Sequence, residues 1–342
     1  MLVLFPARAF IYILLYGSPR PQRRISDLSV LLIYKQLTYS TMKKLLFSLF
    51  ALMCLFSAQA QTGQEYFDTG MNYFSSKEYT NAIACFKKAN DLAGGNNPAC
   101  QYNIGQSYDR QQDYPQAVYW YRKAAEQGNS AAQFNLGFYY ESGRGVEQDC
   151  SQAVYWYRKA AEQGDSYAQY NLGLCYQNGR GVEQNYSQAV YWYRKAAEQG
   201  DSYAQYNLGY CYKNGRGVEQ NYSQAVYWYR KAAEQGQRDA QCNLGTCYAQ
   251  GQGVEQNYSQ AVYWFHKAAE QGYDIAQCNL GICYAQGQGV EQNDSQAVYW
   301  FRKAAEQGYS NAQHNLGLCY QNGWGVEKDD SQAEYWLKKS QE

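Results

Sequence analysis

Histidine, the side chain best suited to acid–base chemistry and metal binding near neutral pH, occurs only twice in this chain of 342 residues. His266 stands where other copies of a repeated segment have arginine, on the polar side of a predicted helix. His314 shares its repeat position with Cys242 and Cys278, one residue in each successive copy. Neighbouring helices pack about 8–10 Å apart, whereas zinc ligands lie about 2.0–2.3 Å from one ion. The sequence therefore predicts no metal site.

Motifs for nucleotide, serine-hydrolase and metalloprotease chemistry are missing, and so is a C-x-x-C pair. The segment 179–181, Gly-Arg-Gly, has the glycine content of a phosphate loop, but no strand is predicted before it. Glycine directly after a helix is a common terminator, because it adopts positive φ without a Cβ clash. We therefore expect no catalytic residue and no cofactor, and we predict that the protein is not an enzyme.

Eleven cysteines raise the question of disulfides. Equivalent positions in adjacent helix pairs should exceed the roughly 7 Å limit between bridged Cα atoms. Cys242 and Cys247 lie five residues apart on one helix and point in different directions. We interpret the cysteines of the repeats as small buried apolar side chains. The pairing state of Cys85, Cys100 and Cys150 stays open. Five cysteines recur every 36 residues on one helix face: Cys175, Cys211, Cys247, Cys283 and Cys319.

The N-terminal segment reads as a targeting signal and not as part of a fold. Residues 42–60 combine two lysines, an apolar run and an A-x-A site before residue 61. We predict that this is a secretory signal peptide of bacterial type, and that residues 1–41 are an upstream extension from a misassigned start; a longer targeting segment is the alternative. Removal of residues 1–60 leaves 23 basic and 29 acidic residues. This mildly acidic balance gives no field for binding nucleic acid.

The element that must position the remaining side chains is a repeat of 36 residues. The string AVYWYRKAAEQG occurs at 117–128, 153–164, 189–200 and 225–236, with near copies at 261–272 and 297–308. A single unit buries too little apolar surface to be stable alone, so the units must stack into a solenoid. We predict two tetratricopeptide-like units in 61–128 and six further units at 129–164, 165–200, 201–236, 237–272, 273–308 and 309–342.

Each unit is predicted to form two helices, here named helix A and helix B. In 165–200, Asp165 or Ser166 caps helix A, which extends to about Asn178. Asn185 and Gln188 fit a capping box for helix B, which ends near Gly200. Helical projection places the tryptophans of helix B on its apolar face. We therefore expect a core column of Trp120, Trp156, Trp192, Trp228, Trp264, Trp300 and Trp336.

The segment YNLGLCYQNGRGVEQNYSQAVYWYRKAAEQG at 170–200 resembles the Sel-1-like repeat, a relative of the tetratricopeptide repeat. The resemblance covers 129–342 closely. It implies an all-α, right-handed superhelical solenoid that serves as a scaffold or adaptor for other proteins, with helix A on the concave side. Cysteine-rich secreted relatives bridge helix B to the next helix A; Ala197 stands at that position here, so the bridge is absent. A hydrolase activity, claimed for some of those relatives, is the least favoured alternative.

Differences between the copies indicate where a ligand binds. Units 165–200 and 201–236 differ only at Leu174 against Tyr210 and at Gln177 against Lys213, opposite the core face of helix A. Aromatic residues gather on the same face, and aromatic residues dominate binding hot spots. We predict a ligand-binding surface, here named the helix A surface, made of Phe134, Phe138, Tyr167, Tyr170, Leu174, Tyr203, Tyr206, Tyr210 and Lys213.

A second aromatic series lies on the polar face of helix B. We name it the helix B ladder, and we expect Glu334 to end it. It is either a second contact surface or a set of tyrosines packed on their own neighbours, and the sequence leaves both open. Its members are Tyr119, Tyr155, Tyr191, Tyr227, Tyr263 and Tyr299.

These observations favour an exported scaffold, periplasmic or secreted, that binds other proteins or peptide segments. The alternative is a glycan-binding solenoid that stacks sugar rings on exposed Tyr and Trp faces. We expect neither nucleic acid as a partner nor a transmembrane segment in the mature chain.

Overall fold

The computed structural model describes residues 27–342, which consist of helices, turns and loops with no strand. The predicted upstream extension before residue 27 lies outside the described residues. The chain divides into residues 1–62 and 63–342, and the repeats make up the second part. The helices are α2 (Asp27–Ser75), α3 (Tyr79–Leu92), α4 (Pro98–Arg110), α5 (Tyr114–Glu126), α6 (Ser130–Ser142), α7 (Cys150–Glu162), α8 (Ser166–Asn178), α9 (Tyr186–Glu198), α10 (Ser202–Asn214), α11 (Tyr222–Glu234), α12 (Arg238–Gln250), α13 (Tyr258–Glu270), α14 (Asp274–Gln286), α15 (Asp294–Glu306), α16 (Ser310–Asn322) and α17 (Asp330–Lys339).

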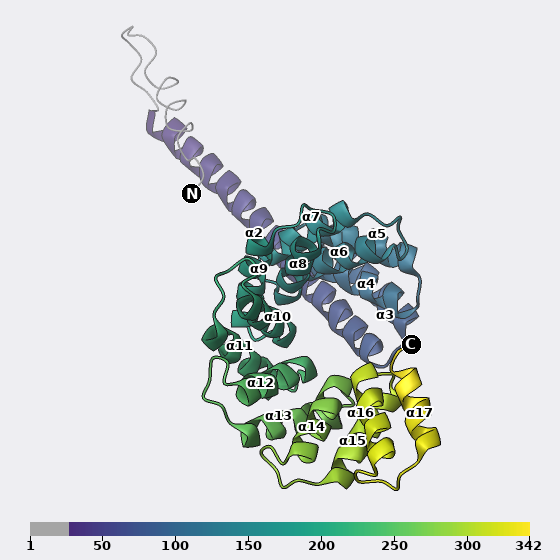
Figure 1. The fold of residues 1–342 in the computed structure, drawn as a ribbon. Coiled ribbons are helices and arrows are strands. Elements are labelled where there is room, and N and C mark those ends of the chain that lie inside the picture. The colour runs from purple at the N-terminus through teal and green to yellow at the C-terminus, as the bar shows by residue number, and fades with distance from the viewer. Residues whose placement is uncertain (1–26) are drawn as a thin grey trace. The chain divides into compact units, whose positions relative to one another are not determined.

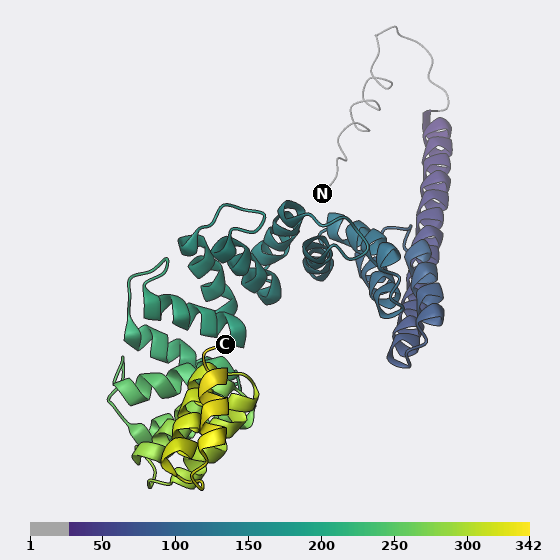
Figure 2. The same ribbon diagram turned by 45° about the vertical axis from the view of Figure 1, so that its right-hand side comes forward.

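Residues 63–342 form an all-α solenoid, as predicted. Each helix A packs against its own helix B and against the preceding one, so the pairs follow one another in chain order (Figure 2). Figure 1 shows α10, α12, α14 and α16 on the inner side of the curve, with α11, α13, α15 and α17 outside. The helix A elements therefore line the inner side of this part of the arc.

The helix ends follow from local capping chemistry. Asp165 Oδ1 accepts a hydrogen bond from the Ala168 amide at 2.8 Å, and Asn185 Oδ1 accepts one from the Gln188 amide at 3.0 Å. Gly179 follows α8 with a φ of +69°, in the left-handed region that favours glycine. The predicted caps at Asp165 and Asn185 and the terminator are confirmed. The capping box is only half formed, because the Asn185 amide donates to the Tyr176 carbonyl at 2.9 Å and not to the Gln188 side chain.

The core passes from one unit into the next through the tryptophans. Trp192 of α9 packs into the cluster that Tyr157 and Leu172 form, and Trp228 of α11 packs in the same way one unit later. Trp192, Trp228 and Trp300 are buried, and the other four tryptophans of the column are half-buried against the same kind of cluster. The predicted core column is confirmed. Each unit thus supplies part of its neighbour's core, which explains why one unit cannot fold alone.

A chain of hydrogen bonds joins helices within one unit and to the preceding unit. The Gln199 side chain donates to Gln169 Oε1 at 2.8 Å, and Gln169 in turn donates to the Ala161 carbonyl of the preceding helix at 3.1 Å. The loop glycine Gly217 lies so close to the Tyr186 backbone that a Cβ would overlap its carbonyl group. Because Gly217 also has a φ of +73°, no other residue fits there without strain.

The segment predicted to be a signal peptide is helical and differs from the repeats in its exposure. Leu45, Leu46, Phe47, Phe50 and Met53 are all exposed, whereas the large apolar side chains of the repeat units are mostly buried or half-buried. None of the described helices is long and apolar enough to cross a membrane.

The cysteines of the repeats lie in the structure as free thiols. The five-member column from Cys175 to Cys319 is buried, as predicted. Cys100 is also a buried free thiol, while Cys85 and Cys150 are half-buried free thiols.

Candidate functional site

The predicted helix A surface contains an aromatic stripe made of two pairs of rings, and each pair joins adjacent units. The ring of Phe134 lies 6.0 Å from that of Tyr167 in the next unit, and the ring of Tyr170 lies 6.1 Å from that of Tyr203 one unit further. The inner edge of the stripe rests on the core, because Phe134 and Tyr170 also contact the buried rings of Tyr157 and Tyr193. The stripe therefore crosses the boundaries between three units.

The members of the helix A surface differ in how much of each side chain faces solvent. Tyr167 is 64% exposed and Tyr203 is 60% exposed, whereas Phe138 is 43% exposed. The remaining six, Phe134, Tyr170, Leu174, Tyr206, Tyr210 and Lys213, are half-buried. Tyr167 and Tyr203 are thus the rings most available to a partner.

The C-terminal end of the stripe is charged. Lys213 Nζ lies 3.5 Å from Asn243 Oδ1, and the guanidinium of Arg216 lies 5.5 Å from the Tyr210 ring centre. Burial and the nearby Asp239 carboxylate raise the pKa of Tyr206 to about 12, so its hydroxyl remains protonated at physiological pH.

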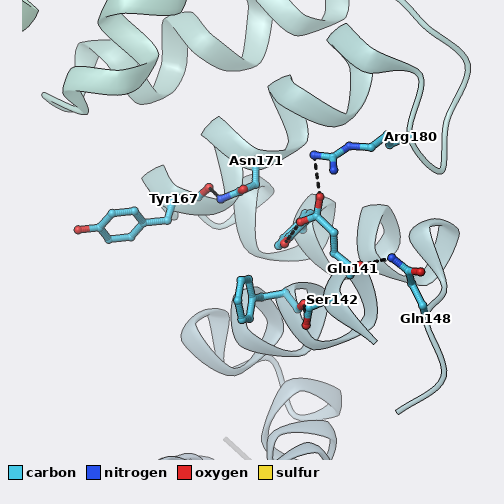
Figure 3. A network of polar contacts seen from close by, with 8 residues as sticks. Glu141, Ser142, Gln148, Tyr167, Asn171 and Arg180 are labelled. Carbon is cyan, nitrogen blue, oxygen red and sulfur yellow. Dashed lines mark hydrogen bonds and ion pairs between the residues drawn. The ribbon is translucent and has the colours of Figure 1, made fainter. Parts of the chain in front are cut away.

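A polar cluster not anticipated from the sequence lies beside the stripe, where a loop meets the helix pair of the preceding unit (Figure 3). Glu141 Oε2 accepts a hydrogen bond from the Tyr157 hydroxyl at 2.7 Å, and its other oxygen lies 2.9 Å from Arg180 Nη2. Burial and the Glu141 carboxylate raise the pKa of the Tyr157 hydroxyl. We name the place where these three repeat positions meet, those of Glu141, Tyr157 and Arg180, the junction.

The junction changes from unit to unit in a coordinated way. In the next unit Gln177 replaces Glu141 and lies 3.0 Å from the Tyr193 hydroxyl. One unit later the helix A residue is Lys213, and the buried hydroxyl of Tyr229 has no hydrogen-bond partner. In the following two units Ala249 and Ala285 stand at the helix A position, and Phe265 and Phe301 replace the tyrosine. Where helix B carries tyrosine at the junction, helix A thus supplies an oxygen acceptor, and where helix B carries phenylalanine, helix A has alanine. The exception is the unit with Lys213 and Tyr229, in which lysine offers no acceptor to the tyrosine hydroxyl.

The helix B ladder is uniform. Each tyrosine is 45–49% exposed. In most units its ring meets the following tryptophan edge-on, as for Tyr191 and Trp192 with ring centres 4.9 Å apart. A lysine one turn later lies over the same ring, as Lys195 does at 5.3 Å. Each ladder tyrosine therefore packs on its own helix and exposes about half of its surface.

The expected end of the helix B ladder at Glu334 is wrong. Tyr335 continues the ladder, is 52% exposed and lies 4.9 Å from Trp336. Glu334 occupies the repeat position of Val298. The charged residue therefore stands next to the ladder position and not at it.

The two histidines do not meet. His266 pairs with Glu270 at 3.4 Å and packs edge-on against Trp300, while His314 is exposed. Across the described residues, no group of three or more His, Cys, Asp or Glu side chains could hold a metal ion.

The model of the Sel1 repeat family matches the chain eight times, at residues 57–93, 98–129, 130–165, 166–201, 202–237, 238–273, 274–309 and 310–340. This chain is a Sel1 repeat protein. The first two matches cover the part for which the sequence predicted tetratricopeptide-like units.

Two solved structures resemble this Sel1 repeat protein along most of its length. A protective antigen of uropathogenic Escherichia coli strains, described as displaying an SLR fold, is 39% identical over 83% of this chain, with a TM-score of 0.78. A Sel1 repeat protein from Oxalobacter formigenes is 38% identical over 71% of this chain and 97% of its own, with a TM-score of 0.64. The chain spans 62% of the length of the E. coli antigen. No curated protein matches it.

Proposed function

We propose that this Sel1 repeat protein is a non-catalytic scaffold that binds an extended or helical segment of another protein along the helix A surface. The observation that carries the proposal is the aromatic stripe, in which Phe134 contacts Tyr167 and Tyr170 contacts Tyr203 across unit boundaries. Phe134 and Tyr170 also rest on buried core rings. Rigid aromatic side chains lose little conformational entropy on binding, and they contribute a large share of interface free energy. Family membership supports the same function, because Sel1 repeats typically mediate protein interactions.

The stripe suits a segment longer than a few residues. It extends over α6, α8 and α10, so an occupant that contacts both Tyr167 and Tyr203 crosses a boundary between units. Lys213 and Arg216 lie at its C-terminal end, so an acidic group at the matching end of the partner segment would be favoured.

Export of the protein is part of this proposal. Leu45, Leu46, Phe47, Phe50 and Met53 of the apolar run after Lys43 and Lys44 are exposed, and an A-x-A site follows the run. The E. coli relative is described as a protective antigen, which is in keeping with an exported protein. N-terminal sequencing of protein from the native cell is expected to give Gln61, and a chain beginning at Met1 in the cytoplasm would contradict export.

Photo-crosslinking from the helix A surface tests the proposal. A benzoyl-phenylalanine placed at Tyr203 is expected to capture one or a few proteins in native cells, identified by mass spectrometry. The matched control carries the same group at Tyr227 of the helix B ladder, which is 47% exposed. Equal capture of the same protein from both positions would contradict binding along the helix A surface.

Glycan binding is the second candidate, and the regular helix B ladder is the observation that favours it. Half-exposed rings at every unit, each beside a lysine, could stack sugar rings in sequence. Retention on immobilised cell-envelope polysaccharide, lost in Tyr191→Ala with Tyr227→Ala, would establish this function in place of the protein scaffold.

A further inference from the structure

A cavity of about 330 Å³ lies between α14, α15 and α16. It is outside the helix A surface defined above, in the last two units of the chain. Its apolar wall consists of Ile282, Ala285, Phe301, Leu318 and Cys319, with Trp324 at the side of the connecting loop. Asp294, Asn315, Gln286 and Gln292 supply polar groups.

The cavity is the junction of these two units, and it corresponds residue by residue to the Glu141 cluster 144 residues earlier. Ala285 replaces Glu141, Phe301 replaces Tyr157 and Trp324 replaces Arg180. In the earlier junction, the carboxylate of Glu141 accepts a hydrogen bond from the Tyr157 hydroxyl and pairs with the Arg180 guanidinium (Figure 3). The later junction has lost all three of these polar groups.

These replacements define the chemistry of an occupant. A polar group placed against Ala285 and Phe301 would give up hydrogen bonds to water without finding partners, which is unfavourable. An apolar group has no such cost and gains from leaving water. The part of the cavity that faces these two side chains therefore selects an apolar group.

Trp324 indicates that the apolar group is aromatic. Trp324 is 52% exposed, and its five counterparts in the other units that carry this loop are arginine or glutamine. A flat indole at the edge of an apolar cavity offers a stacking or edge-on contact to a second ring. The polar groups of Gln292 and Asn315 can bind the peptide groups on either side of such a ring.

We infer that this cavity is a binding pocket for an aromatic side chain presented by a peptide segment. Ile282 and Leu318, which line it, are the counterparts of Phe138 and Leu174, so the pocket is a local elaboration of the same helix A face in units that lack the aromatic stripe. The inference does not depend on the proposed function of residues 129–236, because none of the residues of the stripe lines the pocket.

Fluorine NMR of protein labelled with 5-fluorotryptophan tests the pocket with defined probes. The Trp324 resonance is assigned as the one absent from Trp324→Phe. The probes are the tripeptide amides acetyl-Gly-Phe-Gly, acetyl-Gly-Leu-Gly and acetyl-Gly-Lys-Gly. We expect the phenylalanine peptide to shift the Trp324 resonance saturably, with smaller shifts for leucine and none for lysine.

Ala285→Leu fills the pocket while it retains Trp324 as the reporter, and it is expected to weaken the phenylalanine peptide by about tenfold or more. Ala249→Leu makes the same change at the corresponding position of the preceding unit, which does not line the cavity, and it should leave peptide binding unchanged. If Ala285→Leu fails to fold, Trp324→Arg is measured by saturation transfer to the peptide, with the same expected loss. Equal responses to the phenylalanine and lysine peptides, or unchanged binding in the filled variant, would overturn the inference whether or not the helix A surface binds a partner.

Discussion

Gly173 in α8 lies directly against the ring of Tyr193 in α9: a Cβ atom at position 173 would come within 2.6 Å of Cδ1 and Cε1 of that ring. The same relationship joins Gly137 to Tyr157 and Gly245 to Phe265. A glycine within a helix destabilises it by about 1 kcal/mol relative to alanine. The close approach of the aromatic ring explains the glycine in the middle of these helices, and in the last unit Gly317 meets the side chain of Leu337 in the same way.

Gly173→Ala is therefore expected to destabilise the solenoid, although alanine favours helices. The displaced ring should cost about 1–3 kcal/mol, measured as a lower midpoint of urea unfolding. Hydrogen exchange should increase first in 165–236, because units contact only their neighbours.

The matched control for this substitution is Gly63→Ala in α2, where the nearest side-chain atom would lie 3.8 Å away. This variant should be neutral or slightly more stable. Equal destabilisation by both substitutions would contradict the role of the ring contact.

The loss of stability when the acceptor at a junction is removed should depend on whether the helix B residue that it contacts is tyrosine or phenylalanine. Glu141→Ala leaves the buried Tyr157 hydroxyl without its partner and is expected to cost about 1–3 kcal/mol. Glu141→Ala with Tyr157→Phe reproduces the pair that the chain already has at Ala285 and Phe301, and it should recover part of the loss. A double-mutant cycle in urea measures this coupling; strictly additive losses would show that the two side chains do not interact.

Tyr229→Phe is expected to leave stability unchanged or to raise it by up to about 1 kcal/mol, because the Tyr229 hydroxyl is buried without a partner. Tyr157→Phe, at the same repeat position, should destabilise the protein, since it removes a hydrogen bond to a carboxylate. Thermal melting of the two single variants gives the comparison. A larger loss for Tyr229→Phe than for Tyr157→Phe would contradict the assigned hydrogen bonding.

The thiols of the repeats should react slowly in the folded protein. Burial raises the pKa of Cys175 and Cys242 to about 12, and that of Cys211 and Cys319 to about 11. Because the thiolate is the reactive form, little of it is present at pH 8. We expect all ten mature thiols to react with a chromogenic disulfide after denaturation without reductant, and only the half-buried ones to react quickly before it. Four or five disulfides in the mass spectrum of unreduced protein would contradict this.

The sequence predicts those features of the fold that depend on neighbours along the chain. The caps at Asp165 and Asn185, the terminator at Gly179 and the tryptophan column follow from spacing within one unit, and the structure confirms them. The Glu141 cluster could not be found in this way, because Arg180 reaches it from the loop of the following unit. Its signal in the sequence is the joint change from Glu141 and Tyr157 to Ala285 and Phe301, which becomes meaningful only once the structure shows the two positions in contact.

The structure also changes which residues best test the helix A surface. Tyr170 packs on the buried Tyr193, so its truncation affects both the surface and the core. Tyr167 and Tyr203 expose most of their rings and stabilise the core least. They therefore separate binding from folding better than Tyr170 and Tyr210 do.

The most direct measurement is the dissociation constant of the partner captured from Tyr203, titrated by calorimetry against two double variants. Tyr167→Ala with Tyr203→Ala is expected to weaken binding by about 2 kcal/mol or more, roughly 30-fold, with a nearly unchanged melting temperature. Tyr191→Ala with Tyr227→Ala on the helix B ladder should leave the affinity within about twofold of the unmodified protein. The opposite pattern, in which the ladder pair abolishes binding and the helix A pair does not, would contradict a scaffold that binds through its helix A surface.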